Sequence, residues 1–252
     1  MTTILITACV NPGEMINTKL IDSGIREKQY KDVLTFYLEN TNMDIVFVEN
    51  SNTDFSQDFM YYIDIGRLEY IAFAGNQICI DKGKGYGEAN IIKYAFDTSN
   101  KIKEADYIIK ITGRLKITNI NHLLRYTNKV LKKNNKYIIA QISNKYDFVS
   151  TQFFVAHKEY FNKYLFNDIQ QINEVKGIYL EHIVANNVKS WTNSHNKFRL
   201  FISPFKIEGV SGSTGDVYKN PNIKNYIYKA LSVARFNFRY LLYDLGIIKT
   251  WY

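Results

Sequence analysis

The chain opens with the run TILITACV at residues 3–10, and a polar turn, Asn11-Pro12-Gly13, follows it directly. The run is rich in apolar and β-branched side chains and shows no alternation of polar with apolar residues. A run of this kind is typical of a strand that is buried on both faces of a sheet. Such strands occur in parallel sheets covered by helices, so the run predicts an α/β protein.

Three similar runs follow, at residues 44–48, 68–74 and 107–111. Between them, residues 25–40 and about 88–96 place apolar side chains at the spacing of a helix. This alternation predicts a mostly parallel central sheet flanked by helices. In the less regular second half we expect strands near 137–142, 148–156 and 198–202 and helices near 157–165 and 179–189.

The composition favours a packed protein and excludes a disordered or fibrous one, because 46% of the 252 residues are hydrophobic and 22% are charged. With 2 cysteines and 3 prolines, no disulfide framework and no Cys/His metal cluster are expected. The four histidines lack the spacing of metal ligands. The N-terminus does not resemble a signal peptide, and no run approaches the ~20 apolar residues of a membrane span. We therefore expect a cytoplasmic protein that contacts a membrane only at its surface.

Two basic segments carry the formal net charge of +8. Residues 101–136 hold ten Lys and Arg against two acids, and residues 219–252 hold six against one, so the rest of the chain is acidic. The charge predicts a polyanionic partner, which could be nucleic acid, an acidic membrane face or a phosphorylated substrate.

The C-terminal segment at 223–245 has the pattern of an amphipathic helix. Aromatic residues suited to a lipid headgroup boundary accompany it, including Phe236, Tyr240 and Trp251. We expect this helix to rest on an anionic membrane surface, with packing against another subunit of a homo-oligomer as the alternative. One face carries Ile227, Leu231, Ala234, Phe238, Leu241, Leu242 and Leu245, and the other carries Lys224, Lys229, Arg235 and Arg239.

Polar residues collect just beyond the carboxyl ends of the expected strands, where parallel sheets bind their ligands. They lie at 7–11, 49–51 and 110–114. Lys110 interrupts an apolar run in a strand that should be buried, and a buried lysine needs an anionic partner. This favours a ligand contact for Lys110 over a solvated basic strand end, with Arg114 as a bidentate phosphate or sugar contact.

A glycine-rich stretch, KGKGYGE at residues 82–88, precedes the helix expected near 88–96. Glycines allow backbone N–H groups to approach a phosphate, and Lys84 adds positive charge. The spacing is neither that of the P-loop nor that of the dinucleotide fingerprint, so a flexible connection is the alternative.

Taken together, these strand-end motifs resemble bacterial glycosyltransferases of the GT-A fold, of the kind that build capsule, O-antigen or lipooligosaccharide. The resemblance covers most of residues 3–218 and is strongest over Arg-x-x-Gln-Tyr at 26–30, Glu-Asn-Ser at 49–51, residues 82–88, residues 110–114 and Glu-Gly-Val-Ser-Gly at 208–212. It implies a Rossmann-like domain at 1–218, in which residues 1–118 bind a nucleotide-sugar, with UDP-sugar as the expected donor. Residues 119–218 would receive a lipid-linked or oligosaccharide acceptor, and residues 219–252 would be an appended helical segment.

The resemblance also implies the residues that contact the donor. They are Thr7, Ala8, Asn11, Arg26, Glu49, Asn50, Ser51, Lys82, Gly83, Lys84, Gly85, Tyr86, Gly87, Glu88, Asn90, Thr112, Gly113, Ser211, Gly212 and Ser213. A surface salt bridge is the alternative for Arg26, and a helix or turn cap is the alternative for residues 49–51. The glycine-rich loop at 208–215 could close over the donor as a lid or merely connect to the last helix.

The sequence departs from the family at the fourth strand. GT-A enzymes usually carry an Asp-x-Asp motif there, whose carboxylates hold a divalent cation on the diphosphate. Residues 110–114 read KITGR and contain no carboxylate. Lys110 and Arg114 can stabilise the departing diphosphate electrostatically, so we expect transfer without a metal cofactor, although the sequence does not exclude Mg²⁺ or Mn²⁺.

Two carboxylates are candidates for the catalytic base that an inverting transferase needs. Glu181, at the expected start of a helix, resembles the acidic position that serves this role in the family, and Asp147 competes with it. A structural role for Glu181, as a helix cap or in a pair with His182, is the alternative, and a retaining enzyme would need neither base.

Two other classes of function compete with glycosyl transfer. A nucleic-acid-binding protein would use the two basic segments and the tyrosines, although it would not need polar motifs at successive strand ends. A nucleotidyltransferase on the same kind of sheet is the other candidate.

Overall fold

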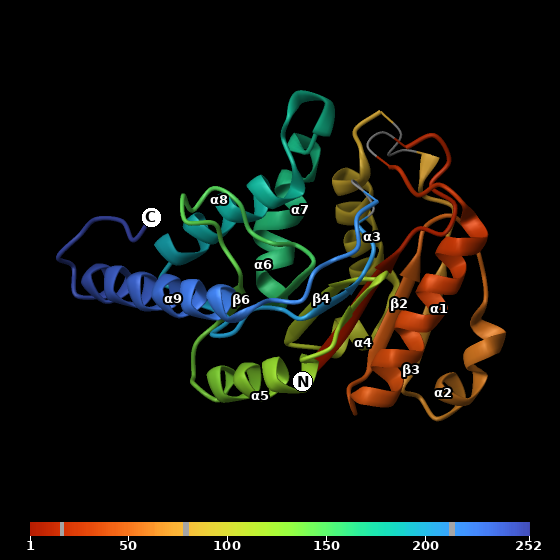
Figure 1. Cartoon of the computed structure of the whole chain (residues 1–252), viewed down its shortest axis with the longest axis horizontal. Helices are drawn as coiled ribbons and strands as arrows, with labels where there is room; N and C mark the ends of the chain where they lie inside the picture. The colour runs from red at the N-terminus through yellow and green to blue at the C-terminus, as the bar shows by residue number, and fades with distance from the viewer. Residues whose placement is uncertain (16–17, 78–80, 212–214) are drawn as a thin grey trace.

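A computed structural model describes residues 1–15, 18–77, 81–211 and 215–252. The chain forms a mixed α/β structure in which a central sheet is covered by helices on both faces, and a long C-terminal helix lies at the end of the molecule opposite α1 and α2 (Figure 1). This architecture confirms the predicted fold class. No helix among the described residues has the length and apolarity needed to cross a bilayer.

The central sheet has seven strands in the order β3-β2-β1-β4-β7-β6-β8. Within this sheet, β7 runs antiparallel to both of its neighbours and the other pairings are parallel. Because β4 pairs with β7, the two halves of the predicted domain share one sheet. The strands are β1 (Thr2–Ala8), β2 (Ile45–Glu49), β3 (Leu68–Ala72), β4 (Tyr107–Thr112), β6 (Tyr137–Ala140), β7 (Phe153–His157) and β8 (Lys197–Leu200).

Strand β1 explains why the sheet is covered on both faces. Ile4 and Ile6 point into the apolar layer beneath helices α1 (Ser23–Asn40) and α5 (Ile120–Leu131), whereas Leu5 points into the opposite layer. That second layer lies beneath α3 (Lys84–Thr98) and α8 (Leu180–Asn193). Alternate side chains of one strand therefore fill two cores, as a period of two requires.

Shorter elements connect these layers. They are η1 (Ser56–Phe59), α2 (Met60–Asp64), α4 (Asn100–Glu104), α6 (Lys158–Tyr160), the π-helical η3 (Phe161–Leu165), α7 (Phe166–Asp168), η4 (Ile169–Gln171) and η5 (Glu174–Lys176). A second, two-stranded sheet pairs β5 (Leu115–Ile117) with β9 (Ile207–Gly209). The sequence did not predict this small sheet, which holds the loop after β9 beside the end of β4.

Helix α3 begins at Lys84, four residues before the predicted start. Most of the glycine-rich stretch, which was expected to precede the helix, therefore belongs to it. Gly83 precedes the helix with φ of +92°, a conformation that favours glycine. A Cβ on Gly83 would lie 2.7 Å from the carboxylate of Glu174, and one on Gly85 would lie 3.2 Å from Cβ of Leu180. These glycines allow α3 to pack closely against the 174–180 segment.

The predicted C-terminal helix is confirmed as α9 (Ile223–Asp244). Phe236 and Tyr240 are buried against the domain, together with Trp251. The prediction that these three aromatic residues lie at a lipid boundary is therefore wrong, because they anchor α9 to the protein.

Candidate functional site

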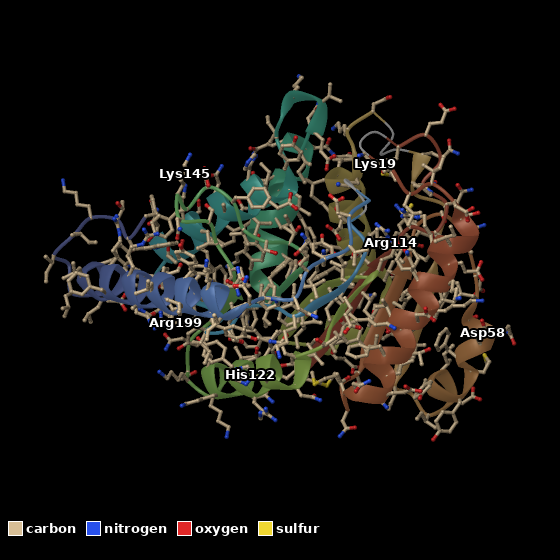
Figure 2. The ribbon with its side chains drawn as sticks, in the orientation of Figure 1. Lys19, Asp58, Arg114, His122, Lys145 and Arg199 are labelled. Atoms are coloured by element: carbon tan, nitrogen blue, oxygen red, sulfur yellow. The ribbon has the colours of Figure 1, made fainter. Side chains whose placement is uncertain are left out.

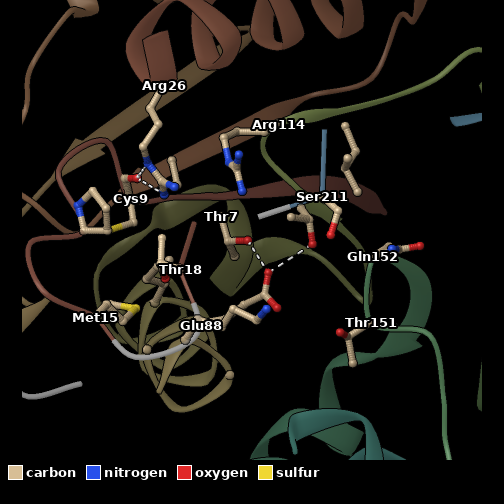
Figure 3. A pocket seen from close by; sticks show the side chains of 18 of the residues that line it. Thr7, Cys9, Met15, Thr18, Arg26, Glu88, Arg114, Thr151, Gln152 and Ser211 are labelled. Atoms are coloured by element: carbon tan, nitrogen blue, oxygen red, sulfur yellow. Dashed lines mark hydrogen bonds between the residues drawn. The ribbon is translucent and has the colours of Figure 1, made fainter. Parts of the chain in front are cut away.

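A cavity of about 190 Å³ lies at the carboxyl ends of β1 and β4. The sheet order places β2 and β3 on one side of β1 and β4 on the other, so chain progression reverses between β1 and β4. Ligands of open α/β sheets bind at such a reversal. Thr7 lies one residue before the end of β1 and Thr112 ends β4, and both line the cavity. Figure 3 shows Thr7 beside Glu88.

Twelve of the predicted site residues line this cavity. They are Thr7, Ala8, Arg26, Asn50, Lys84, Gly85, Gly87, Glu88, Thr112, Arg114, Glu181 and Ser211. They come from strand ends, from α1, from the start of α3, from the start of α8 and from the loop after β9.

Arg114 is the most distinctive of these side chains. It is 9% exposed and follows β4 by two residues. Figure 2 places it in the whole molecule, and Figure 3 shows its guanidinium at the cavity. Nη1 donates a long hydrogen bond of 3.4 Å to Oε1 of Gln29. Within the described residues, no carboxylate lies within 4.0 Å of this guanidinium. A buried cation in this situation favours an anionic ligand.

Arg26 is buried too, but the protein itself uses its hydrogen bonds. Its guanidinium donates to the carbonyl oxygens of Cys9, Val10 and Leu20 and to the hydroxyl of Tyr30. The alternative of a surface salt bridge is therefore wrong. Carbonyl partners do not neutralise the charge, so Arg26 holds the chain after β1 and adds positive potential beside the cavity.

Lys110 lies behind the cavity wall and is fully buried. Its Nζ donates to Oε1 of Glu88 at 2.5 Å, to Oγ1 of Thr112 at 2.9 Å and to the carbonyl of Thr151 at 2.6 Å. These three partners use its three donors. The anion that buried Lys110 requires is thus Glu88 of the same chain, and the predicted direct ligand contact does not fit this geometry.

Glu88 joins the two strand ends to α3. Oε1 accepts hydrogen bonds from Oγ1 of Thr7 at 2.9 Å and from Oγ1 of Thr112 at 3.1 Å, besides that from Lys110. The side chain of Glu88 remains 19% exposed where it lines the cavity. Burial lowers the pKa of Lys110, and the charge of Glu88 opposes this shift.

Glu181 faces the same cavity from the first turn of α8. Oγ1 of Thr151 donates to its Oε1 at 2.9 Å. His182 is engaged elsewhere, because its Nδ1 accepts from the backbone N–H of Tyr179 at 3.4 Å. Burial raises the pKa of Glu181 above its ordinary value. A carboxyl group in such surroundings suits proton transfer.

Asp147 lies outside the cavity on an exposed turn. Its Oδ1 accepts a hydrogen bond from Oγ of Ser143 at 2.6 Å, and this bond lowers the pKa of Asp147. Asp147 therefore stabilises its own turn, and Glu181 is the candidate base that the fold brings to the cavity.

The start of α3 is occupied by a carboxylate of the protein. Oε1 of Glu174 accepts a hydrogen bond from the backbone N–H of Gly85 at 2.8 Å. Glu174 is 5% exposed and its Oε2 is buried without a hydrogen-bond partner among the described residues. The predicted phosphate cradle is therefore filled by Glu174, although the side chain of Lys84 still lines the cavity.

Of the motif at 49–51, only Asn50 lines the cavity. Glu49 is fully buried and accepts hydrogen bonds from the backbone N–H groups of Val10, Ser51 and Thr53, which fits the predicted cap. Asn50 differs, since its buried Oδ1 has no hydrogen-bond partner among the described residues. An unpaired amide oxygen beside a cavity can accept a hydrogen bond from a ligand.

The remaining predicted residues serve the surrounding structure. Lys82 donates to Gln170 at 2.8 Å, and Asn90 donates to the carbonyl of Tyr86 at 2.7 Å. A Cβ on Gly113 would lie 2.5 Å from the carbonyl oxygen of Thr7, so glycine there allows the end of β4 to approach β1. The residues that do not line the cavity are Asn11, Glu49, Ser51, Lys82, Gly83, Tyr86, Asn90, Lys110, Gly113 and Asp147.

The loop after β9 covers part of the cavity. Val210, Ser211 and Tyr218 line it, and the pairing of β9 with β5 places this loop beside Arg114. Gly212 and Ser213, which were predicted to contact the donor, lie outside the described residues.

Sequence reasoning missed several polar residues of the cavity, including Thr18, Thr151, Gln152, Glu174 and Tyr218. Thr151 and Gln152 immediately precede β7, which runs antiparallel to β4, so its first residues lie at the carboxyl end of β4. Nε2 of Gln152 donates to the hydroxyl of Tyr218 at 2.6 Å. Recognising β7 as antiparallel was the signal that could have identified Thr151 and Gln152.

The end of β4 carries cationic side chains and no carboxylate. Lys110, Thr112 and Arg114 lie where the GT-A resemblance would place metal-binding acids, and the ammonium of Lys110 binds Glu88. Among the described residues, no three His, Cys, Asp or Glu side chains are grouped so that they could hold a metal ion.

No protein-family model and no curated protein matches the sequence. Solved structures resemble the fold at low identity. They include a glycosyltransferase involved in the glycosylation of the major capsid of PBCV-1 (10% identity, 80% of this chain and 84% of that chain, TM-score 0.46). Another is the inositol-1-phosphate CTP transferase from T. maritima (11% identity, 92% of this chain and 96% of that chain, TM-score 0.47). A third is the mannosyltransferase Ktr4p from S. cerevisiae (8% identity, 80% of this chain and 68% of that chain, TM-score 0.42). These TM-scores lie below 0.5, so the likenesses do not assign a function to this chain.

Proposed function

We propose that this protein is a glycosyltransferase that moves a sugar from a nucleotide-sugar, with UDP-sugar as the expected donor, to a hydroxyl of a glycan acceptor. The observation that carries the proposal is that Arg114 and Glu181 face one cavity at the β1/β4 reversal of the sheet. One is a buried cation without a described carboxylate partner, and the other is a carboxyl group whose pKa is raised. Sugar transfer from a diphosphate with inversion at the anomeric carbon uses these two kinds of group.

The reaction divides between these two side chains. The acceptor oxygen attacks the anomeric carbon, the bond from that carbon to the diphosphate oxygen breaks, and the hydroxyl proton passes to the carboxylate of Glu181. The leaving nucleoside diphosphate takes the electron pair of the broken bond. Arg114 stabilises this negative charge with its fork of N–H donors, and Lys84 adds a second positive charge at the cavity wall.

Asn50 is the candidate contact for the nucleoside. Its buried amide oxygen lines the cavity at the end of β2 and can accept a hydrogen bond from the base or ribose. Lys110 and Glu88 would act behind the site, since their ion pair fixes Thr7 and Thr112 at the two strand ends.

We further propose that transfer needs no metal, because Arg114 and Lys84 supply positive charge where the family uses a cation. The acceptor would be lipid-linked and part of a capsule, O-antigen or lipooligosaccharide, as the sequence resemblance implies. Such an acceptor would place the enzyme on the inner face of the cytoplasmic membrane.

The test is nucleotide release from a panel of nucleotide-sugars, measured with and without EDTA. We expect release of nucleoside diphosphate from one donor class, with the rate unchanged by EDTA. Loss of activity with EDTA and its return with Mn²⁺ would overturn the metal-independent mechanism. Formation of a nucleotide-sugar and pyrophosphate from a nucleoside triphosphate and a sugar phosphate would instead identify a nucleotidyltransferase. Salt-sensitive binding of generic RNA or DNA, without binding of any nucleotide-sugar, would identify a nucleic-acid-binding protein.

A further inference from the structure

The outward face of α9 carries a stripe of large apolar side chains that the described residues leave uncovered. Their exposed fractions lie between 54% and 77%. At 3.6 residues per turn, the six side chains fall within a sector of roughly 80° on one side of the helix. The α9 stripe consists of Ile223, Ile227, Leu231, Phe238, Leu241 and Leu245. A continuous exposed patch of this kind marks an interaction surface.

The side of α9 opposite the stripe packs against the rest of the protein, so the stripe faces outward. The rings of Phe236 and Trp251 pack against Phe198, each with its centroid 5.5 Å away, and the hydroxyl of Tyr240 accepts from the backbone N–H of Phe198 at 3.3 Å. Nε1 of Trp251 donates to Oγ1 of Thr192 at 2.9 Å. The helix is thus anchored by one face and leaves the other exposed. It lies at the end of the molecule opposite α1 and α2 (Figure 1).

The charges around the stripe indicate an anionic partner. Asp244 is the sole acid of residues 219–252, and its carboxylate pairs with Lys197 at 3.1 Å. Four exposed cations of this segment have no carboxylate within 4.0 Å among the described residues: Lys219, Lys224, Arg235 and Lys249. A second copy bound about a two-fold axis would bring the same cations together, which disfavours self-association through this face.

We propose that the α9 stripe docks on an anionic lipid bilayer, with α9 lying in the plane of the interface. The apolar side chains would enter the boundary between headgroups and acyl chains, while the cations contact acidic headgroups. This inference stands on α9 alone and goes beyond the proposed sugar transfer, because it names the surface on which the protein would meet a membrane.

The experiment is flotation of the full-length protein with vesicles of phosphatidylethanolamine and phosphatidylglycerol, with pure phosphatidylcholine vesicles as the neutral comparison. The test variant is L231Q/F238Q. The matched control is Y61Q/I65Q, at α2 and its C-cap, where the side chains are comparably exposed. We expect wild type and control to float with the anionic vesicles, and L231Q/F238Q to lose binding by on the order of tenfold or more. Melting temperatures of the variants confirm that each is folded.

Salt and charge provide a second measurement. Binding of the wild type should weaken as salt rises, and K224Q/K249Q should bind more weakly and show a smaller salt dependence. Equal binding by wild type and L231Q/F238Q, or no binding of anionic vesicles, would overturn the proposal. A wild-type dimer that L231Q/F238Q converts to a monomer, without vesicle binding, would assign the stripe to a second copy instead. Donor hydrolysis is measured in the same samples, so failure of docking and failure of the proposed activity are distinguished.

Discussion

Lys110 and Glu88 form a buried ion pair, with Nζ and Oε1 2.5 Å apart, that connects the end of β4 to α3. The ammonium is fully buried, whereas the carboxylate side chain is 19% exposed toward the cavity. The two charges therefore differ in their surroundings. The ammonium is solvated by protein groups alone, whereas the carboxylate also borders the cavity. Removing Glu88 alone should lower the free energy of unfolding more than removing both partners does.

We predict that E88A lowers the free energy of unfolding by about 3 kcal/mol at pH 7, because it leaves a buried ammonium without its counter-ion. K110M/E88A should recover most of this loss, since it removes the ammonium as well. Urea unfolding of the two variants and of K110M measures the coupling. Equal losses in E88A and in the double variant would contradict the interpretation.

The pH dependence of E88A follows from the lowered pKa of Lys110. Between the lowered pKa of the folded state and the ordinary value of 10.5, the unfolded chain binds more protons, so stability rises with pH there. Loss of Glu88 lowers the folded pKa further. The loss in the free energy of unfolding that E88A causes should therefore be largest at neutral pH and shrink as the pH rises toward 10.5.

Arg114 should determine the stability of the departing diphosphate. R114Q keeps a polar side chain but removes the charge, so we expect kcat/KM for the nucleotide-sugar to fall by on the order of 10²- to 10³-fold. R114K keeps the charge but lacks the planar set of N–H donors, so its kcat/KM should fall less than that of R114Q. R125Q, on the exposed face of α5, is the matched control and should retain wild-type kinetics. Similar kinetics of R114Q and R125Q would exclude this role.

Strand and helix assignments in the first half could be predicted because local pattern and tertiary context agree there. The apolar run at 3–10 is buried on both faces, and it reaches the cavity with Thr7 and Ala8. Arg114 could be placed at the site for the same reason, since it follows a strand whose direction was predicted correctly.

The misassignments share a different cause. The sequence shows that Lys110 needs an anion but not which one, and Glu88 is 22 residues away and on another element. Likewise, Glu174 reaches the start of α3 through a contact across 89 residues. A carboxylate of the protein and a phosphate of a ligand satisfy the same donors, so local sequence does not distinguish them.

Glu174 should stabilise α3 by accepting from its first turn. E174A removes the acceptor of the Gly85 N–H group and a negative charge at a helix N-terminus, so we expect a loss of about 1 to 2 kcal/mol in the free energy of unfolding. E174Q keeps a hydrogen-bond acceptor, so its free energy of unfolding should fall less than that of E174A. E208A, at the exposed position of β9, serves as the control in the same urea titrations. An E174A protein as stable as E208A would show that the bond contributes nothing.

Glu181 should control the acid side of the pH profile. As the base it must be unprotonated, and burial raises its pKa above the ordinary value of 4.5. Activity should therefore rise with pH through an inflection above 4.5, and kcat/KM should fall as the pH drops through that inflection. E181Q should lose on the order of 10²- to 10⁴-fold in kcat and lack this limb of the profile. D147N changes an exposed carboxylate outside the cavity and should keep both the rate and the limb.

The same shift gives a stability measurement that does not depend on a substrate. Between 4.5 and the raised pKa, the folded chain binds more protons than the unfolded chain, so the contribution of Glu181 to stability falls as the pH rises through that window. E181Q removes this dependence and should become relatively more stable toward neutral pH. An unchanged acid limb in E181Q, together with an unchanged pH dependence of unfolding, would rule out a raised pKa at Glu181. Loss of the limb without loss of rate would show that its titration affects binding rather than proton transfer.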